Sequence, residues 1–337
     1  MPILGIIASG ISGNLIPPRD IAVAHYGSPY VAAWPWSAGF GTKYAAPATT
    51  PTGNGYGVAF LGNSAIAVGH YTSPRVSAYP WSSGFGTKYA NPATLPTGNG
   101  DSLAFNNLGD AIAVSHSTSP YVSAYPWSAG FGTKYANPAT LPTGNGRGVA
   151  FTTADDAIAV AHQTSPYISA YPWSSGFGTK YANPATTPTG NAGAVAFTDA
   201  DNAIAVAHDG SPYISAYPWS AGFGTKYSNP ATLPTGNVKD VAFTAADNAI
   251  AVAHYNSPFI TAYPWSSGFG TKYANPATLP ASIGGGYGVT FNGDSEIAVG
   301  TSSSPYLSVY PWSSGFGTKY ASAPGTPITP KSVAFTS

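Results

Sequence analysis

The sequence predicts an all-β protein built as a seven-bladed β-propeller. Three observations predict this fold: a motif that recurs seven times, four short strand-like stretches in each copy, and the absence of helical periodicity. Successive copies lie 45 to 47 residues apart. A fixed period of roughly 20–50 residues is typical of repeat architectures whose units bury their apolar faces against one another. The dipeptide SP marks the copies at Pro29, Pro74, Pro120, Pro166, Pro212, Pro258 and Pro305.

Four stretches of each copy have strand character, separated by Gly, Pro, Asn and Asp. In the fourth copy they are Val149–Phe151, Ala157–His162, Tyr167–Trp173 and a stretch centred on Thr179–Ala182. Four short strands in a unit of this length are the pattern of a propeller blade. We therefore expect four-stranded blades.

Alternation along the strands predicts how the blades pack. In the second stretch, Ile158 and Val160 share one face while alanines occupy the other. In the third, Tyr171 and Trp173 share a face opposed to Ala170. We expect the bulky face of one blade to meet the small face of its neighbour.

The two ends of the repeat predict a closed ring. The chain enters the repeat at a second strand, Ile21–His25, and finishes on a first strand, Val333–Phe335, that lacks its own blade. Pairing these two strands completes the first blade and leaves no open edge. The C-terminal strand is therefore expected to close the ring.

Two segments are expected: residues 1–20, and a propeller of residues 21–337. The apolar run Ile3–Ala8 is shorter than the roughly 20 residues of a membrane span, and no basic residue precedes it to suggest a secretory signal. We interpret residues 1–20 as a flexible or strand-like terminus, or as a short strand that docks on a partner by extending its sheet.

The composition indicates a chain that relies little on charge. Of its 337 residues only 7% are charged, and the net charge is zero. Non-specific attraction to nucleic acid or to an anionic membrane is therefore not expected. Because cysteine is absent, disulfides, thiol catalysis and cysteine metal sites are excluded.

The run VAFTTADDAIAVAHQTSPYISAYPW, Val149–Trp173, resembles the core of WD-repeat propellers. The resemblance extends over residues 21–337 and implies the same ring closure. It departs from the family where Ser follows Trp in place of Asp, and in the linker GFGTKYANPATLPTGNG. The opening MPILGIIASGISG and the repeat PWSSGFGTKYANPAT also resemble segments of tailed-bacteriophage virion proteins, which implies an adsorption or decoration role without catalysis.

Histidine ends the second strand in six copies, and Thr301 takes the seventh place. A ring of histidines suggests metal binding, but equivalent residues of successive blades lie too far apart to share one ion. We interpret each histidine as a bridge between loops of its own blade. The six are His25, His70, His116, His162, His208 and His254.

Two further residue types recur in every copy. The lysine of TKY is expected to protect an outer strand edge, with an anion-binding rim as the alternative. The tryptophan of PW is expected to pack between blades, with a platform for a sugar as the alternative. The lysines are Lys43, Lys88, Lys134, Lys180, Lys226, Lys272 and Lys319. The tryptophans are Trp36, Trp81, Trp127, Trp173, Trp219, Trp265 and Trp312.

Acidic residues gather in the turn between the first and second strands, where Asp and Asn bond to their own backbone. Their spacing does not match a calcium loop, and no nucleophile elbow, phosphate loop or zinc helix occurs. The sequence thus predicts no enzyme, no cofactor and no metal. The turn residues include Asp110, Asp155, Asp156, Asp199, Asp201, Asp247 and Asp294.

Two positions vary among the copies while their surroundings do not. One precedes the first strand and the other follows the histidine, and the loops that carry them emerge on the same face of a meander. The variation is either drift at exposed positions or a diversified recognition surface around one mouth of the channel. The candidate binding residues are Tyr26, Tyr56, Tyr71, Asp101, Arg147, Asp209, Lys239, Tyr255 and Tyr287.

These expectations together predict a non-enzymatic structural or attachment protein of a virion, such as a tail, fibre or decoration protein. The expected partners are other virion proteins, or a glycan or receptor of the host surface. Nucleic acid and membrane insertion are not expected. The alternative is a freestanding, polyvalent sugar-binding propeller of the lectin kind. The expected location is the virion, and otherwise an extracellular or soluble one.

Overall fold

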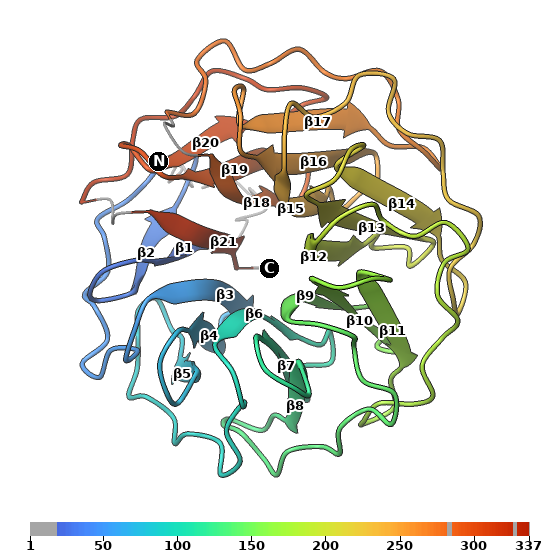
Figure 1. Ribbon diagram of the computed structural model, residues 1–337. Helices are drawn as coiled ribbons and strands as arrows, with labels where there is room; N and C mark the ends of the chain where they lie inside the picture. Colours follow the sequence, from blue (N-terminus) through green and yellow to red (C-terminus); the bar gives the residue numbers. More distant parts are fainter. Residues whose placement is uncertain (1–18, 282–284, 326–328, 337) are drawn as a thin grey trace, which may run out of the picture.

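The computed structural model describes residues 19–281, 285–325 and 329–336, and its regular elements there are all β-strands (Figure 1). Seven antiparallel sheets of three strands each surround a central channel, as predicted for a seven-bladed propeller. The expectation for residues 1–20 falls almost wholly outside the described residues, since β1 begins at Arg19. No helix in the described residues has the length and apolar character needed to cross a membrane.

Each blade contributes one strand to the wall of the channel. These inner strands are β3 (Gly55–Leu61), β6 (Gly100–Phe105), β9 (Gly146–Phe151), β12 (Ala192–Phe197), β15 (Val238–Phe243), β18 (Gly286–Asn292) and β21 (Pro330–Phe335). The middle strands are β1 (Arg19–His25), β4 (Ala65–His70), β7 (Ala111–His116), β10 (Ala157–His162), β13 (Ala203–His208), β16 (Ala249–His254) and β19 (Glu296–Thr301). The outer strands are β2 (Val31–Trp36), β5 (Val76–Pro80), β8 (Val122–Pro126), β11 (Ile168–Pro172), β14 (Ile214–Pro218), β17 (Ile260–Pro264) and β20 (Leu307–Pro311).

The expected fourth strand does not form a regular ladder. In the β9–β10–β11 blade, the backbone N–H of Tyr181 donates to the carbonyl of Ala170 at 2.9 Å, and an isolated bridge joins Trp173 to Phe177. Pro172 has no N–H to offer a further strand, and the backbone turns sharply at Ser175, where φ is 52°. The segment therefore follows β11 through a few isolated backbone bonds, including Gly178 N–H to the carbonyl of Pro172 at 2.8 Å, without forming a continuous ladder.

Packing between blades follows the predicted alternation. Ala157, Ala159 and Ala161 of β10 lie in one core cluster with Ile204 and Val206 of β13 in the next blade. Tryptophan completes this layer, as the packing interpretation expected. Trp219 belongs to the same cluster and is only 5% exposed. Small faces therefore meet bulky faces all round the ring.

The ring closes through the C-terminal strand, as predicted. β21 pairs antiparallel with β1, with Val23 opposite Val333 and Ile21 opposite Phe335. Beyond this register, the backbone of Thr336 donates to the carbonyl of Asp20 at 2.9 Å, and the backbone N–H of Asp20 donates to the Thr336 hydroxyl at 2.8 Å. The first and last strands of the chain therefore share one blade (Figure 1).

One aspartate of the turn between inner and middle strands joins neighbouring blades, which the sequence did not reveal. Asp201 adopts a left-handed backbone, with φ of 53°. Its carboxylate accepts hydrogen bonds from the backbone of Thr153 at 2.8 Å and of Ala154 at 2.7 Å, both in the preceding blade. Corresponding bonds from other turns are made by Asp155, Asp247 and Asp294. The sequence predicted hydrogen bonds from these aspartates to their own backbone, and the structure shows that they also bond to the backbone of the preceding blade.

Replacing Asp201 with Ala should lower the free energy of unfolding by about 2 kcal/mol, because two charge-assisted hydrogen bonds are lost and Ala is strained at positive φ. Asp201→Asn keeps one acceptor and tolerates this backbone, so it should lose about half as much. Calorimetric melting of the two variants checks the order. Equal melting temperatures for Asp201→Ala and the wild type would contradict a role in joining the blades.

Candidate functional site at the channel mouth

A β-bulge in every blade lies at one end of the channel. In β9, Gly148 pairs with Ala161 and Gly146 pairs with His162, so Arg147 is the extra residue of the strand. The same shift occurs in the other six inner strands. A bulge interrupts the ladder and redirects a side chain, and bulges are common next to active sites. The seven bulge residues form what we call the mouth ring: Tyr56, Asp101, Arg147, Gly193, Lys239, Tyr287 and Lys331.

The mouth ring lines a cavity of about 310 Å³. Asp209 and Gln163, from the loops after the middle strands, also line it. Six of the nine predicted binding residues therefore surround one cavity: Tyr56, Asp101, Arg147, Asp209, Lys239 and Tyr287. The other three, Tyr26, Tyr71 and Tyr255, contact members of the ring through their aromatic rings. The structure thus brings all nine together, while their role in binding stays a prediction.

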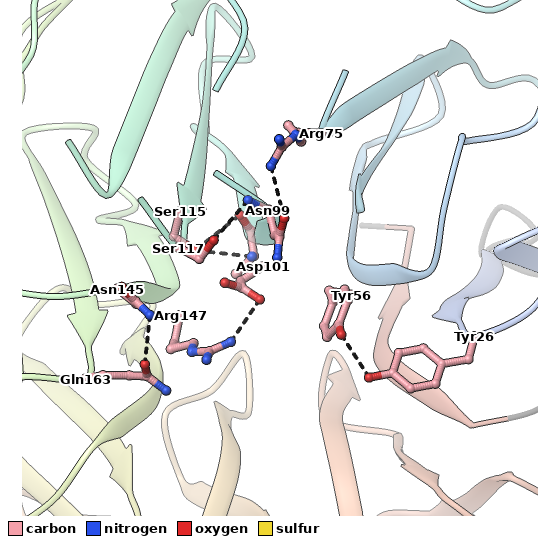
Figure 2. A network of polar contacts seen from close by, with 11 residues as sticks. Tyr26, Tyr56, Arg75, Asn99, Asp101, Ser115, Ser117, Asn145, Arg147 and Gln163 are labelled. Atoms are coloured by element: carbon pink, nitrogen blue, oxygen red, sulfur yellow. Dashed lines mark hydrogen bonds and ion pairs between the residues drawn. The ribbon is translucent and has the colours of Figure 1, made fainter. Parts of the chain in front are cut away.

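Two ion pairs hold cations of the mouth ring in place. An Arg147 Nη1–Asp101 Oδ1 contact of 3.1 Å joins neighbouring blades, and Figure 2 shows Arg147 beside Asp101. Lys239 Nζ lies 2.9 Å from Asp209 Oδ1. Gln163 lies 3.0 Å from Asn145, and turning its amide round lets its oxygen accept from the Arg147 guanidinium at 2.8 Å. These contacts fix the cations at the cavity wall.

One carboxylate oxygen of Asp101 has no hydrogen-bond partner among the described residues. Its side chain is buried, and its Oδ2 atom has no hydrogen-bond partner among the described residues. Burial raises the pKa of Asp101 to about 6, although Arg147 acts in the opposite direction. Buried carboxylate oxygens are normally hydrogen-bonded, so this oxygen is a candidate to accept a hydrogen bond from a ligand in the cavity.

Tyrosines form the opposite side of the mouth. The Tyr26 hydroxyl donates to the Tyr56 hydroxyl at 2.9 Å, as Figure 2 shows, and the two rings meet edge to face at 5.5 Å. Tyr56 lies 6.2 Å from Tyr71, and Tyr255 lies 6.3 Å from Tyr287. The cavity is therefore charged on one side and aromatic on the other.

Lys331 lies on the aromatic side. Its Nζ is 3.3 Å from the centroid of the Tyr287 ring and 4.6 Å from that of Tyr26. Desolvation, and to a lesser extent the charge of Lys239, lowers the pKa of Lys331 to about 8. Lys331 occupies the variable position of the repeat, yet the sequence-based choice of nine residues did not include it.

A second ring lies one residue deeper in each inner strand, and it consists of Gly57, Ser102, Gly148, Ala194, Asp240, Gly288 and Ser332. Small residues are required here because inner strands approach closely. A Cβ on Gly148 would lie 2.7 Å from the Cα of Ala194 in the next blade. Asp240 is the one charged member of the second ring, and it lines the deeper cavity below the mouth.

Asp240 is held by the backbone of two blades. Its Oδ1 accepts from the N–H of Val241 and its Oδ2 from the N–H of Val289, each at 2.9 Å. Burial nevertheless raises the pKa of Asp240 to about 7, against the lowering effect of these two bonds. The sequence does carry a signal for this residue, because no other copy has a charge at that position. The predicted binding residues do not include Asp240, because they were drawn only from the two positions that vary most among the copies.

In five of the six histidines Nε2 contacts a side-chain hydroxyl of the outer strand in the same blade, whereas Nε2 of His25 has no partner among the described residues. His162 Nε2 lies 3.0 Å from the Ser169 hydroxyl, and its Nδ1 lies 3.5 Å from the Thr143 hydroxyl, both within its own blade. Burial lowers the pKa of His162 to about 4. Within the described residues, no three His, Asp or Glu side chains gather as a metal site would require.

Comparison with known proteins supports the propeller fold but assigns the chain to no sequence family. No family model matches the chain, and no curated protein matches it. The resemblance to WD repeats and to phage virion proteins is therefore unsupported. Many solved structures have a similar fold, and three of them cover almost the whole chain.

The first is a "putative 6-phosphogluconolactonase" from Bacteroides uniformis, with 13% identity and a TM-score of 0.67 over 94% of this chain and 99% of that one. A protein of the same description from Bacteroides fragilis has 11% identity and a TM-score of 0.71 over 95% and 98%. A protein from Lactobacillus plantarum has 13% identity and a TM-score of 0.71 over 95% and 99%. At such identities the likeness shows the propeller fold alone.

The predicted function is corrected by these neighbours. Two are described as enzymes and none of the three as a virion component or a lectin, which contradicts both the virion protein and its alternative. The prediction that the chain is no enzyme is contradicted in the same way. Scarce charge and near-identical copies are properties of this repeat, and they do not indicate whether the protein is an enzyme.

Proposed function

We propose that the protein is an enzyme that hydrolyses the ester bond of a small anionic lactone at the channel mouth. The observation that carries the proposal is Asp240, a carboxylate with a pKa of about 7 below a cavity lined by three cations. Titratable groups with strongly shifted pKa values cluster at functional sites. The names of the two Bacteroides neighbours agree with a lactonase.

Asp240 is suited to act as the general base. A carboxylate whose pKa lies near neutral accepts a proton efficiently while remaining available at physiological pH. In the proposed reaction it takes a proton from a water molecule, which attacks the lactone carbonyl. The ring C–O bond then breaks, and the ring oxygen takes the proton that Asp240 removed from the water and becomes a hydroxyl. The two backbone bonds to Asp240 hold its carboxylate in one orientation.

The cations of the mouth ring are suited to hold the negative charge of the substrate. At the mouth Arg147, Lys239 and Lys331 can contact an anion directly, above the level at which Asp240 lies. Arginine and lysine near a carbonyl also stabilise the oxyanion that forms during attack. The tyrosines on the opposite side offer ring faces and hydroxyl groups to the remainder of the molecule.

Ring opening of several lactones tests this function directly. Wild-type protein should accelerate hydrolysis of 6-phosphogluconolactone with saturation, and should act at least about tenfold less efficiently on uncharged gluconolactone, because a hydrogen bond to a charged group contributes roughly 1.5 kcal/mol or more. Lys239→Gln should raise KM for the charged lactone. Lys226→Gln, which changes a lysine of the outer segment, is the matched control. Rates equal to the uncatalysed reaction for every lactone would overturn the proposal.

A further inference from the structure

The three cations of the mouth ring differ in their surroundings. Arg147 and Lys239 each contact a carboxylate, at 3.1 Å and 2.9 Å. Lys331 forms no ion pair with any described residue and instead contacts the faces of Tyr287 and Tyr26. Its amine is therefore the one cationic group of the ring that no carboxylate keeps protonated.

The position of Lys331 makes its amine accessible from the cavity. It is the bulge residue of β21, it is half-buried, and it lines both the mouth and the deeper cavity. Tyr26 belongs to the loop after β1, and Tyr287 belongs to β18, so three different strands or loops fix its surroundings. A lysine held in this way loses little side-chain freedom when it reacts.

Lysine becomes a nucleophile when its neutral form is populated near pH 7, which desolvation and a neighbouring cation both favour. Both causes act on Lys331 and lower its pKa to about 8. Compared with an ordinary lysine, this gives roughly two hundredfold more neutral amine at pH 7.5.

We propose that Lys331 is a reactive amine that forms an imine with small carbonyl compounds bearing an anionic group. The amine nitrogen bonds to the carbonyl carbon, and the carbonyl oxygen leaves as water with the two amine protons. Arg147 and Lys239, in the same cavity wall, supply the positive charge that selects an anionic compound. This activity does not depend on lactone hydrolysis.

Pyridoxal 5′-phosphate, an anionic aldehyde, is a suitable probe. The protein is incubated with a limiting amount at pH 7.5, the imine is reduced with borohydride, and the labelled peptides are quantified by mass spectrometry. Lys331 should be labelled at least about tenfold faster than any of the other eight lysines, in line with its larger fraction of neutral amine. Pyridoxal without phosphate should label it more slowly.

Two variants separate reactivity from structure. Lys331→Arg keeps a cation against the tyrosines, so it should retain the melting temperature while losing the fast labelling. Lys180→Arg, which changes an outer lysine bonded to Asn183, leaves the mouth ring unchanged and should still label at Lys331. Labelling spread evenly over all lysines, or labelling of Lys331 no faster than that of Lys226, would overturn the proposal. The result is independent of the lactone assay, so either proposal can fail alone.

Discussion

Removal of residues 332–337 should lower the melting temperature by about 7 °C. The truncation removes most of β21, and with it the ladder to β1. Val333, which is 5% exposed, and the Phe335 ring, 5.7 Å from that of Trp36, are lost from the core. The lost burial and hydrogen bonds together are worth on the order of 5 kcal/mol. In a chain of 337 residues roughly 1.4 °C per kcal/mol is typical.

Scanning calorimetry measures this loss, and a second variant shows its cause. Val333→Asp keeps the full length of the chain but places a charge in the closing core, so it should destabilise in the same direction. Thr336→Ser retains the hydroxyl that accepts from Asp20 and should change little. Melting of the truncated chain within about 2 °C of the wild type would show that β21 does not close the ring.

Most of the fold could be predicted because its determinants are local and repeated. The alternation of Ile158 and Val160 with alanines is visible in any single copy, and its consequence for packing follows from strand geometry. Ring closure follows from counting strands at the two ends. The missing fourth strand could not be predicted from strand character alone. Pro172 has no N–H to give such a strand, and only isolated backbone bonds, such as that from Tyr181 to Ala170, join the segment to β11.

Part of the site could be predicted because the seven copies of the repeat can be compared with one another. Arg147 and Lys239 stand out as variable residues in constant surroundings. That these residues are bulges could not be predicted, because a bulge is a property of pairing with the neighbouring strand. Asp240 was not predicted as a site residue, because the cavity that it lines forms only where the inner strands of different blades converge. The predicted function, which the described neighbours contradict, was inferred from composition and repeat resemblance, and both describe the scaffold and not the side chains at its mouth.

Asp240→Asn should reduce kcat for the hydrolysis of an anionic lactone by about 10²–10⁴-fold, the usual contribution of a general base. The amide has almost the same shape and can still accept from one of the two backbone groups, Val241 or Val289. KM should change little, because the cations that hold the substrate remain. The kinetics and the melting temperature of the variant are to be measured together, so that loss of folded protein is not taken for loss of catalysis.

The pH profile distinguishes a base from a residue that only supports the fold. A base must be ionised, and the pKa of Asp240 is about 7, so kcat/KM of the wild type should fall as the pH decreases through 7. The residual activity of Asp240→Asn should lack this limb. Asp209→Asn, at the outer part of the mouth, is the matched control and should preserve the limb while weakening substrate binding through Lys239. An Asp240→Asn enzyme with wild-type kcat and an unchanged limb near pH 7 would exclude this carboxylate as the base.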